Sequence, residues 1–193
     1  MAPPHGVLYK YQTQPNMKFQ ALALATLTAV VGLAPAAEAR SNFDDHLALW
    51  KAAQATGVRT LINPDRCDTE KAYGWYWAAA NELVVCQENK IKGSNAQVEW
   101  TEEDYDTLRH EAHHLVQDCM ARDNRDGLLG AVYRQPIELG YDVLGKARSH
   151  RIAELYAENG ASEHIQIMEI EAFAVAAMNN PLEQVQDIQR YCM

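Results

Sequence analysis

The residues with the clearest chemical potential lie in the segment His110-Glu111-Ala112-His113-His114. His110 and His114 are four positions apart, and residues at this spacing lie on one face of an α-helix. Two imidazoles on one face can bind a single metal ion, typically Zn2+. Glu111 lies next to that face, where its carboxylate can take a proton from a metal-bound water that attacks a carbonyl. The pattern predicts a Zn2+ site at His110 and His114, with Glu111 as the catalytic base.

The surrounding sequence indicates that this motif is in the middle of a helix. Thr101 and Asp104 form a variant of the N-terminal capping signal. From Tyr105 onward, apolar residues recur at helical spacing. We therefore expect a helix that starts near Thr101 and ends near Met120, preceded by strands.

A helix that carries HEAHH and follows a sheet resembles the zincin metallopeptidases. The resemblance covers the motif helix and one downstream helix, not the whole chain. It implies that His110 and His114 bind zinc and that Glu111 is the general base. It also implies an α+β, zincin-like fold: a small, mainly antiparallel sheet packed on the active-site helix, with further helices toward the C-terminus.

The zincin subgroups differ in their third metal ligand. Residues 110–120 read HEAHHLVQDCM and lack the glycine and third histidine of the metzincin type. Residues 168–174 read MEIEAFA, which is similar to the E-x-x-A segment of several gluzincins. This gluzincin-like similarity implies Glu169 as the third ligand. Phe173 departs from the pattern, because those families often carry Asp or Asn there.

The residues themselves leave more than one candidate for the third ligand. Glu169 and Glu171 both lie among apolar residues of a predicted helix, and a buried carboxylate needs a partner or a metal. One of them can equally be solvated while the other forms a salt bridge. We favour Glu169 over Glu171, and His164 is a less favoured donor.

Other polar residues near the motif receive simpler interpretations. His113 is expected to be an ordinary supporting or surface histidine, and His46 and His150 are expected at the surface. Zincins often stabilise the oxyanion with a Tyr or His outside the motif. Three tyrosines are available, and their spacing selects none of them: Tyr133, Tyr141 and Tyr156.

Residues 1–39 are predicted to be an N-terminal extension and a signal peptide. An apolar run from Phe19 to Ala37 follows Lys18 and ends in Ala37-Glu38-Ala39, an A-x-A cleavage site. Cleavage after Ala39 would leave residues 40–193 as a single secreted or periplasmic domain without a stable membrane span. The alternative is an uncleaved membrane anchor.

Composition and cysteine count agree with a single exported domain. The chain has 193 residues, of which 48% are hydrophobic and 22% charged, which excludes a disordered or fibrous protein. A net charge of −9 makes nucleic acid an unfavourable partner. The four cysteines are expected to form disulfides, and their order favours Cys67–Cys86 and Cys119–Cys192.

The remaining segments complete the predicted α+β fold. We expect a helix over residues 43–55, followed by three strands over residues 58–62, 72–78 and 82–87. Toward the C-terminus we expect three helical segments over residues 139–159 (interrupted at Gly140 and Gly145), 162–178 and 182–192. The strand at 82–87 is either an edge strand that pairs with an extended peptide or a buried strand, because Leu83, Val84 and Val85 are consecutive.

Together these features lead to two hypotheses. The first is an exported zinc metallopeptidase that hydrolyses peptide bonds in peptide or protein substrates, with Zn2+ held by His110, His114 and Glu169. The alternative is a non-catalytic, disulfide-stapled exported domain whose HExxH motif is structural or degenerate.

Overall fold

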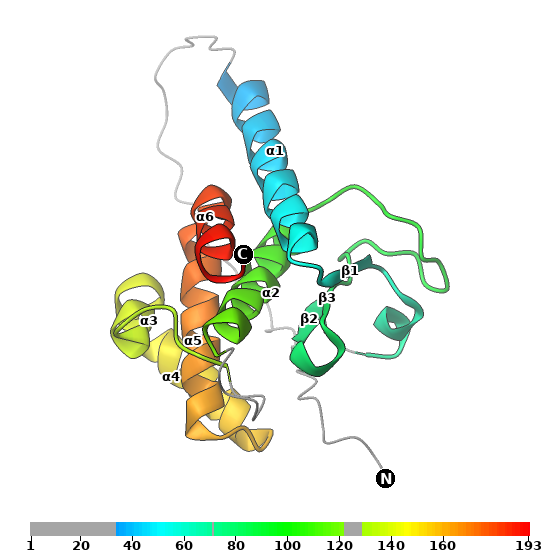
Figure 1. Cartoon of the computed structure of the whole chain (residues 1–193). Helices are drawn as coiled ribbons and strands as arrows, with labels where there is room; N and C mark the ends of the chain where they lie inside the picture. The colour runs from blue at the N-terminus through cyan, green and yellow to red at the C-terminus, as the bar shows by residue number, and fades with distance from the viewer. Residues whose placement is uncertain (1–33, 71, 122–128) are drawn as a thin grey trace, which may run out of the picture.

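The computed structural model describes residues 34–70, 72–121 and 129–193, with side chains from Phe43 onward. The expected signal peptide lies mostly outside these residues, and its cleavage site falls in the first turns of α1. Within the described residues the fold is α+β, with six α-helices and one three-stranded sheet (Figure 1). The elements are α1 (Ala34–Ala55), β1 (Arg59–Ile62), β2 (Gly74–Trp77), β3 (Glu82–Val85), α2 (Glu102–Met120), α3 (Pro136–Leu144), α4 (Lys146–Glu158), α5 (Glu163–Met178) and α6 (Pro181–Tyr191).

The sheet has the strand order β1-β3-β2. β2 and β3 pair antiparallel and are joined through Asn81, which adopts a left-handed conformation with φ 49°. β1 runs parallel to β3, with Arg59 opposite Glu82. The prediction of a mainly antiparallel sheet is therefore wrong for one of the two pairings. Leu83, Val84 and Val85 are completely buried, and a strand that is apolar on both faces takes the centre of the sheet.

This strand order also decides between the two interpretations of residues 82–87. β3 is the buried central strand, so the alternative of an edge strand was wrong. The edge beside α2 is formed by β2 instead, and within the described residues β2 has a strand partner on one side only.

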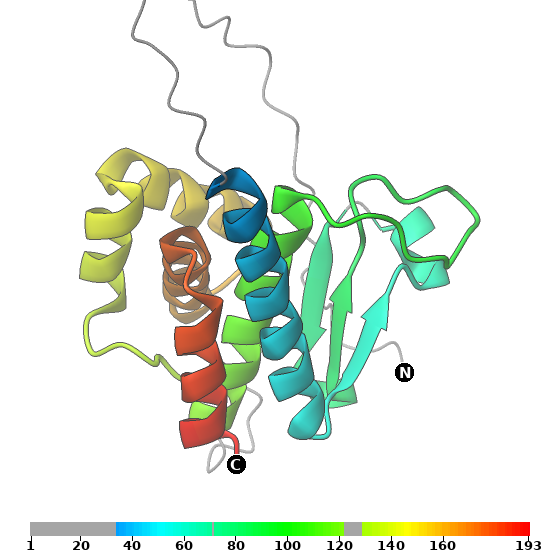
Figure 2. The same ribbon diagram turned by 90° about the horizontal axis from the view of Figure 1, so that it is seen from above.

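All the described α-helices lie on one side of the sheet, and α2 packs directly on that face (Figure 2). α1, α5 and α6 all pack against α2. The main core joins α1, the sheet, α2 and α6, through Leu49, Leu83, Leu108, Val116 and Ile188 among others. α3 and α4 pack on the outer side of α5, where Ile152 and Tyr156 meet Ile170 and Phe173. The fold thus holds α2 between the sheet and α5.

The start of α2 is fixed by the predicted capping interaction. The Thr101 hydroxyl accepts a hydrogen bond from the Asp104 backbone N–H (3.2 Å), and the Asp104 carboxylate accepts one from the Thr101 N–H (2.9 Å). The Asp104 carboxylate also accepts from the Glu88 N–H at 2.7 Å. This buried carboxylate satisfies several donors at once, so it ties the helix to the preceding loop.

The two glycines in the predicted 139–159 segment have different roles. Gly145, with φ 81°, separates α3 from α4, as the sequence predicts. Gly140 lies inside α3 and does not interrupt it. A Cβ atom at Gly140 would lie 2.2 Å from Cγ2 of Ile170, so the absent side chain allows α3 to approach α5 closely.

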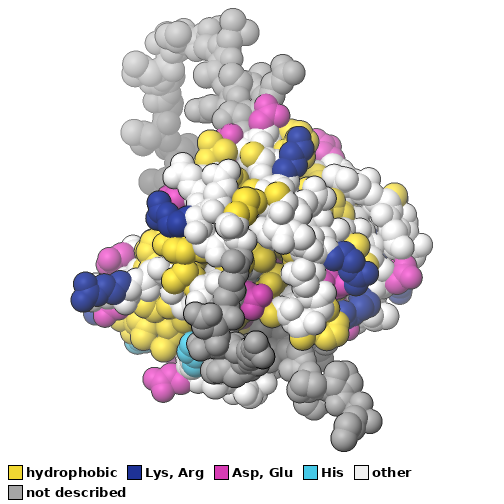
Figure 3. Space-filling model, viewed as in Figure 1, with side chains coloured by type: hydrophobic (Ala, Val, Ile, Leu, Met, Phe, Trp, Pro, Cys, Tyr) yellow, Lys and Arg dark blue, Asp and Glu magenta, His cyan; other side chains and the backbone are white. Residues whose placement is uncertain are grey.

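Both predicted disulfides are confirmed. Cys67–Cys86 ties the segment after β1 to the end of β3, and Cys119–Cys192 ties the end of α2 to the end of α6. Two structural disulfides suggest an oxidising, extracellular environment. Among the described helices, none combines the length and the apolar character needed to cross a membrane. On the face shown in Figure 3, basic and acidic side chains are dispersed and do not form one large patch of a single sign.

Candidate metal centre

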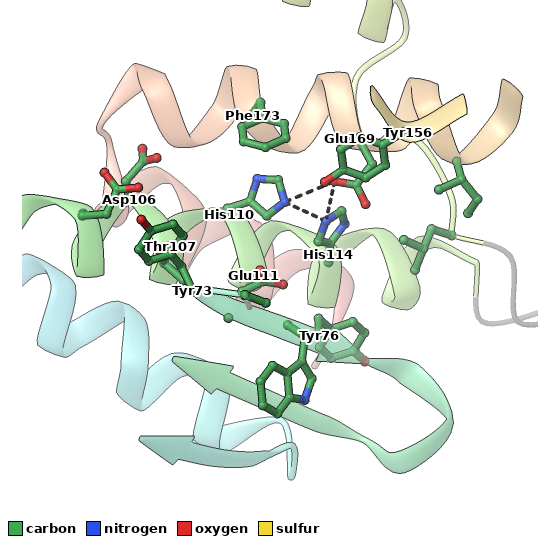
Figure 4. A pocket seen from close by; sticks show the side chains of 16 residues that line it. Tyr73, Tyr76, Asp106, Thr107, His110, Glu111, His114, Tyr156, Glu169 and Phe173 are labelled. Atoms are coloured by element: carbon green, nitrogen blue, oxygen red, sulfur yellow. Dashed lines mark hydrogen bonds and ion pairs between the residues drawn. The ribbon is translucent and has the colours of Figure 1, made fainter. Parts of the chain in front are cut away.

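Three donor atoms from two helices converge between α2 and α5. Nε2 of His110 and Nε2 of His114, both on α2, lie 3.0 Å apart. The Glu169 Oε2 on α5 lies 3.3 Å from the first nitrogen and 3.5 Å from the second (Figure 4). All three side chains are buried. The group formed by His110, His114 and Glu169 could therefore hold a metal ion.

The spacing of these atoms fits a tetrahedral ion. Ligand atoms about 2.0–2.1 Å from a tetrahedral zinc ion lie about 3.3 Å from one another. The three observed separations, 3.0, 3.3 and 3.5 Å, scatter around this value. Moreover, Oε2 of Glu169 is buried and makes no well-formed hydrogen bond with the described residues. A metal ion bound here would neutralise this buried oxygen, so the three residues fit a metal ion.

Without a metal, the charges of this cluster stabilise one another. Burial alone would raise the pKa of Glu169, but the positive charge of His114 and the close polar contacts with both histidines outweigh it and lower the pKa to about 2. Burial alone would lower the pKa of His114, but Glu169, Glu111 and Gln117 outweigh it and raise the pKa to about 9. In the metal-free protein a proton on His114 therefore occupies the region where a metal ion would bind.

Glu111 lies on the side of α2 that faces β2, outside the three-atom cluster (Figure 4). Its carboxylate receives a hydrogen bond from the Tyr76 backbone N–H, and burial raises its pKa. A raised pKa suits a group that must accept a proton near neutral pH. Glu111 is thus placed beside the cluster without belonging to it.

Gly74 sets the distance between β2 and Glu111. A Cβ atom at this position would lie 2.6 Å from Cγ2 of Thr107, 2.6 Å from the carbonyl oxygen of Val84 and 3.2 Å from Cγ of Glu111. Any larger residue would therefore push β2 away from α2. The close approach of this edge strand to Glu111 depends on the glycine.

The cluster opens into a groove with a cavity volume of about 220 Å³. Residues 72–76, at the start of β2, form one wall, and α4 and α5 contribute to the other through Tyr156, Ile165 and Phe173. Asp106 lies toward one end of this groove (Figure 4). His110, Glu111, His114 and Glu169 all line this cavity.

Glu171, the competing candidate, lies away from the cluster. It is completely buried and accepts hydrogen bonds from His113 Nε2 (3.2 Å), Gln117 Nε2 (2.7 Å) and the backbone N–H groups of Val132 (3.2 Å) and Tyr133 (2.7 Å). His164 makes a hydrogen bond with the Leu129 carbonyl (2.6 Å) and is also outside the cluster.

Three further histidines outside the metal-binding pair differ in how far they are buried. His150 is exposed as expected, but the expectation for His46 was wrong. His46 is buried because its Nε2 accepts a hydrogen bond from the buried Arg109 guanidinium at 2.6 Å. His113 is completely buried and donates a hydrogen bond to Glu171, so it is a supporting residue of the interior and not a surface histidine.

Of the three tyrosines considered from the sequence, only Tyr156 lines the groove. The Tyr141 hydroxyl is hydrogen-bonded to Nε2 of His150 at 2.9 Å. Tyr73 and Tyr76 line the groove and were not considered. The alternation of strand residues was the signal for Tyr76, because Gly74 and Tyr76 share the face of β2 that packs on α2.

Comparisons of the chain with protein-family models, with curated proteins and with solved structures found no match.

Proposed function

We propose that this protein is an exported zinc-dependent metallopeptidase with a zincin-like, gluzincin-type site. The observation that carries the proposal is the convergence of His110 Nε2, His114 Nε2 and Glu169 Oε2 at tetrahedral-edge distances inside an open groove. Two histidines and one glutamate form a ligand set of known hydrolytic zinc enzymes, and three protein ligands leave the fourth position free.

The chain supplies the other groups that hydrolysis requires. Zinc bound here would polarise a carbonyl group and make a water molecule more acidic. Glu111, with its raised pKa, takes the proton from the attacking water and delivers it to the leaving amine. The Tyr76 N–H holds the Glu111 carboxylate in place. The ring of Phe173 packs on that of His110, with the ring centroids 4.4 Å apart.

The edge of β2 supports a peptide as the substrate. The Tyr73 carbonyl accepts a hydrogen bond from the Cys86 N–H, so the main-chain polar groups of Tyr73 point toward the strand β3. In an antiparallel pair, successive residues direct their main-chain N–H and C=O groups to opposite sides. Those of Gly74 and Tyr76 therefore point away from β3, where the Tyr76 N–H donates to Glu111 and its carbonyl can pair with a peptide. An extended peptide that pairs along this edge would bring a carbonyl group to Glu111 and the metal ligands.

The test uses the full chain exported into an oxidising compartment and purified with both disulfides intact. Zinc content is measured by mass spectrometry, and hydrolysis is measured on a broad peptide library. We expect one equivalent of zinc and cleavage that a chelator abolishes and added zinc restores. A protein that takes up no zinc would refute the proposal. One zinc without any cleavage would instead support the non-catalytic, disulfide-stapled domain.

A further inference from the structure

A buried glutamine contacts the second metal ligand from behind. Nδ1 of His114 lies 2.7 Å from Oε1 of Gln117, one turn further along α2. Gln117 is completely buried. Its amide nitrogen donates to the Met168 carbonyl (3.0 Å) and to Oε2 of Glu171 (2.7 Å), both on α5. The amide therefore connects His114, one of the three candidate metal ligands, to the buried carboxylate of Glu171.

The orientation of this amide follows from the chemistry of its neighbours. A backbone carbonyl and a carboxylate only accept hydrogen bonds, so the NH2 end of Gln117 must face Met168 and Glu171. The amide oxygen must then face His114 and accept a hydrogen bond from the Nδ1–H, so the proton stays on Nδ1. An imidazole that carries its proton on Nδ1 presents the lone pair of Nε2 to a metal.

Glu171 is held rigidly enough to impose this orientation. Besides Gln117, its carboxylate accepts from His113 and from two backbone N–H groups of the segment that precedes α3. These donors come from α2 and from residues 132 and 133, and Glu171 itself is on α5. The position of its carboxylate is thus set by three parts of the fold and does not depend on a metal.

We propose that Gln117, oriented by Glu171, is a positioning residue that directs His114 Nε2 toward the metal. The inference rests on the proposed metal site, because it assigns a role toward an ion held by His110, His114 and Glu169. Gln117 does not contact the reacting groups. Its effect is to fix which nitrogen of His114 is available and where the ring points.

The test compares zinc affinity at one fixed pH for the wild type, Gln117→Met and Gln184→Met, by competition with a chromogenic chelator. Gln184 is a matched control, since it is also buried and donates to a backbone carbonyl of α2, that of Arg109, at 2.7 Å. We expect Gln117→Met to bind zinc about 10- to 100-fold more weakly, the usual effect of removing a hydrogen-bond partner of a metal ligand. Gln184→Met should lose thermal stability and keep the wild-type zinc affinity.

A second variant tests the role of Glu171. Glu171→Gln should weaken zinc binding less than Gln117→Met, and the double variant should bind no more weakly than Gln117→Met alone, because Glu171 acts through Gln117. If Gln117→Met does not fold, as judged by circular dichroism, Glu171→Gln carries the test. Wild-type affinity in the folded variant would overturn the inference and leave the proposed function intact. A wild type that binds no zinc would overturn the proposed function instead.

Discussion

The carboxylate of Glu169 lies 3.5 Å from Nε2 of His114, although the two residues belong to different helices. Two packing relationships position this contact: Gly140 allows α3 to approach α5 closely, and α2 packs against both α5 and the sheet. The contact joins the HExxH motif to a residue far away in the sequence.

The metal-free protein should lose stability as the pH rises above neutrality. The folded-state pKa of His114, about 9, is above its ordinary value of 6.5. Its ion pair with Glu169 therefore stabilises the fold fully below about pH 6.5, and this stabilisation is lost as the pH rises through about 9. We expect the melting temperature of the chelator-treated protein to fall across this range. The zinc-loaded protein should not show the same fall, and an equal decline in both forms would argue against the contact.

Glu111→Gln should keep zinc and lose hydrolysis. Glutamine has nearly the same shape, can still accept from the Tyr76 N–H, and lies outside the metal-binding group. It cannot accept a proton, so we expect hydrolysis to fall by about 100- to 10,000-fold. Glu103→Gln is the control, because Glu103 also lines the groove but is exposed and does not belong to the group that could hold a metal. Full activity of Glu111→Gln would remove Glu111 from the role of base.

Gly74→Ala should reduce both stability and activity. The added Cβ would meet Thr107 and Val84 at 2.6 Å, and such overpacking costs about 1–3 kcal/mol. Because β2 must shift away from Glu111, hydrolysis per folded molecule should also fall. At Gly93 an added Cβ meets nothing within 4 Å, so Gly93→Ala should affect only its local turn. If both variants have wild-type activity, β2 does not need to lie close to the base.

The two disulfides should contribute unequally to stability. Their sequence separations are 19 residues for Cys67–Cys86 and 73 residues for Cys119–Cys192. Loop-closure entropy predicts losses of about 3 and about 4 kcal/mol when each pair is replaced by serine. Urea denaturation of the two double-serine variants measures this difference. A larger loss for the shorter loop would indicate that native contacts, rather than chain entropy, dominate.

The motif helix and the disulfides could be predicted because their signals are local or few in number. Thr101 and Asp104 mark the start of α2 within one turn, and four cysteines allow only three pairings. The order of the strands was harder to predict, because it depends on which strand is buried on both faces. Three consecutive apolar residues, Leu83, Val84 and Val85, indicate a strand that is buried on both faces, and such a strand takes the centre of the sheet and not its edge.

Side chains that meet across elements were the least predictable part of the site. The burial of His46 depends on Arg109, which reaches it from α2 and also donates to the Ala176 carbonyl on α5 at 2.8 Å. Glu169 and Glu171 have similar apolar neighbours in the sequence and face different partners in the fold. A helical pattern indicates that a carboxylate is buried, but only the packing of α5 on α2 determines what it contacts.

The most direct test of the central claim is anomalous diffraction from crystals of the zinc-loaded protein at the zinc absorption edge. The account predicts one anomalous peak, bounded by Nε2 of His110, Nε2 of His114 and Oε2 of Glu169. The peak should disappear in Glu169→Ala and persist in Glu171→Gln. A zinc ion at another position, or a peak that survives Glu169→Ala at full occupancy, would contradict the account.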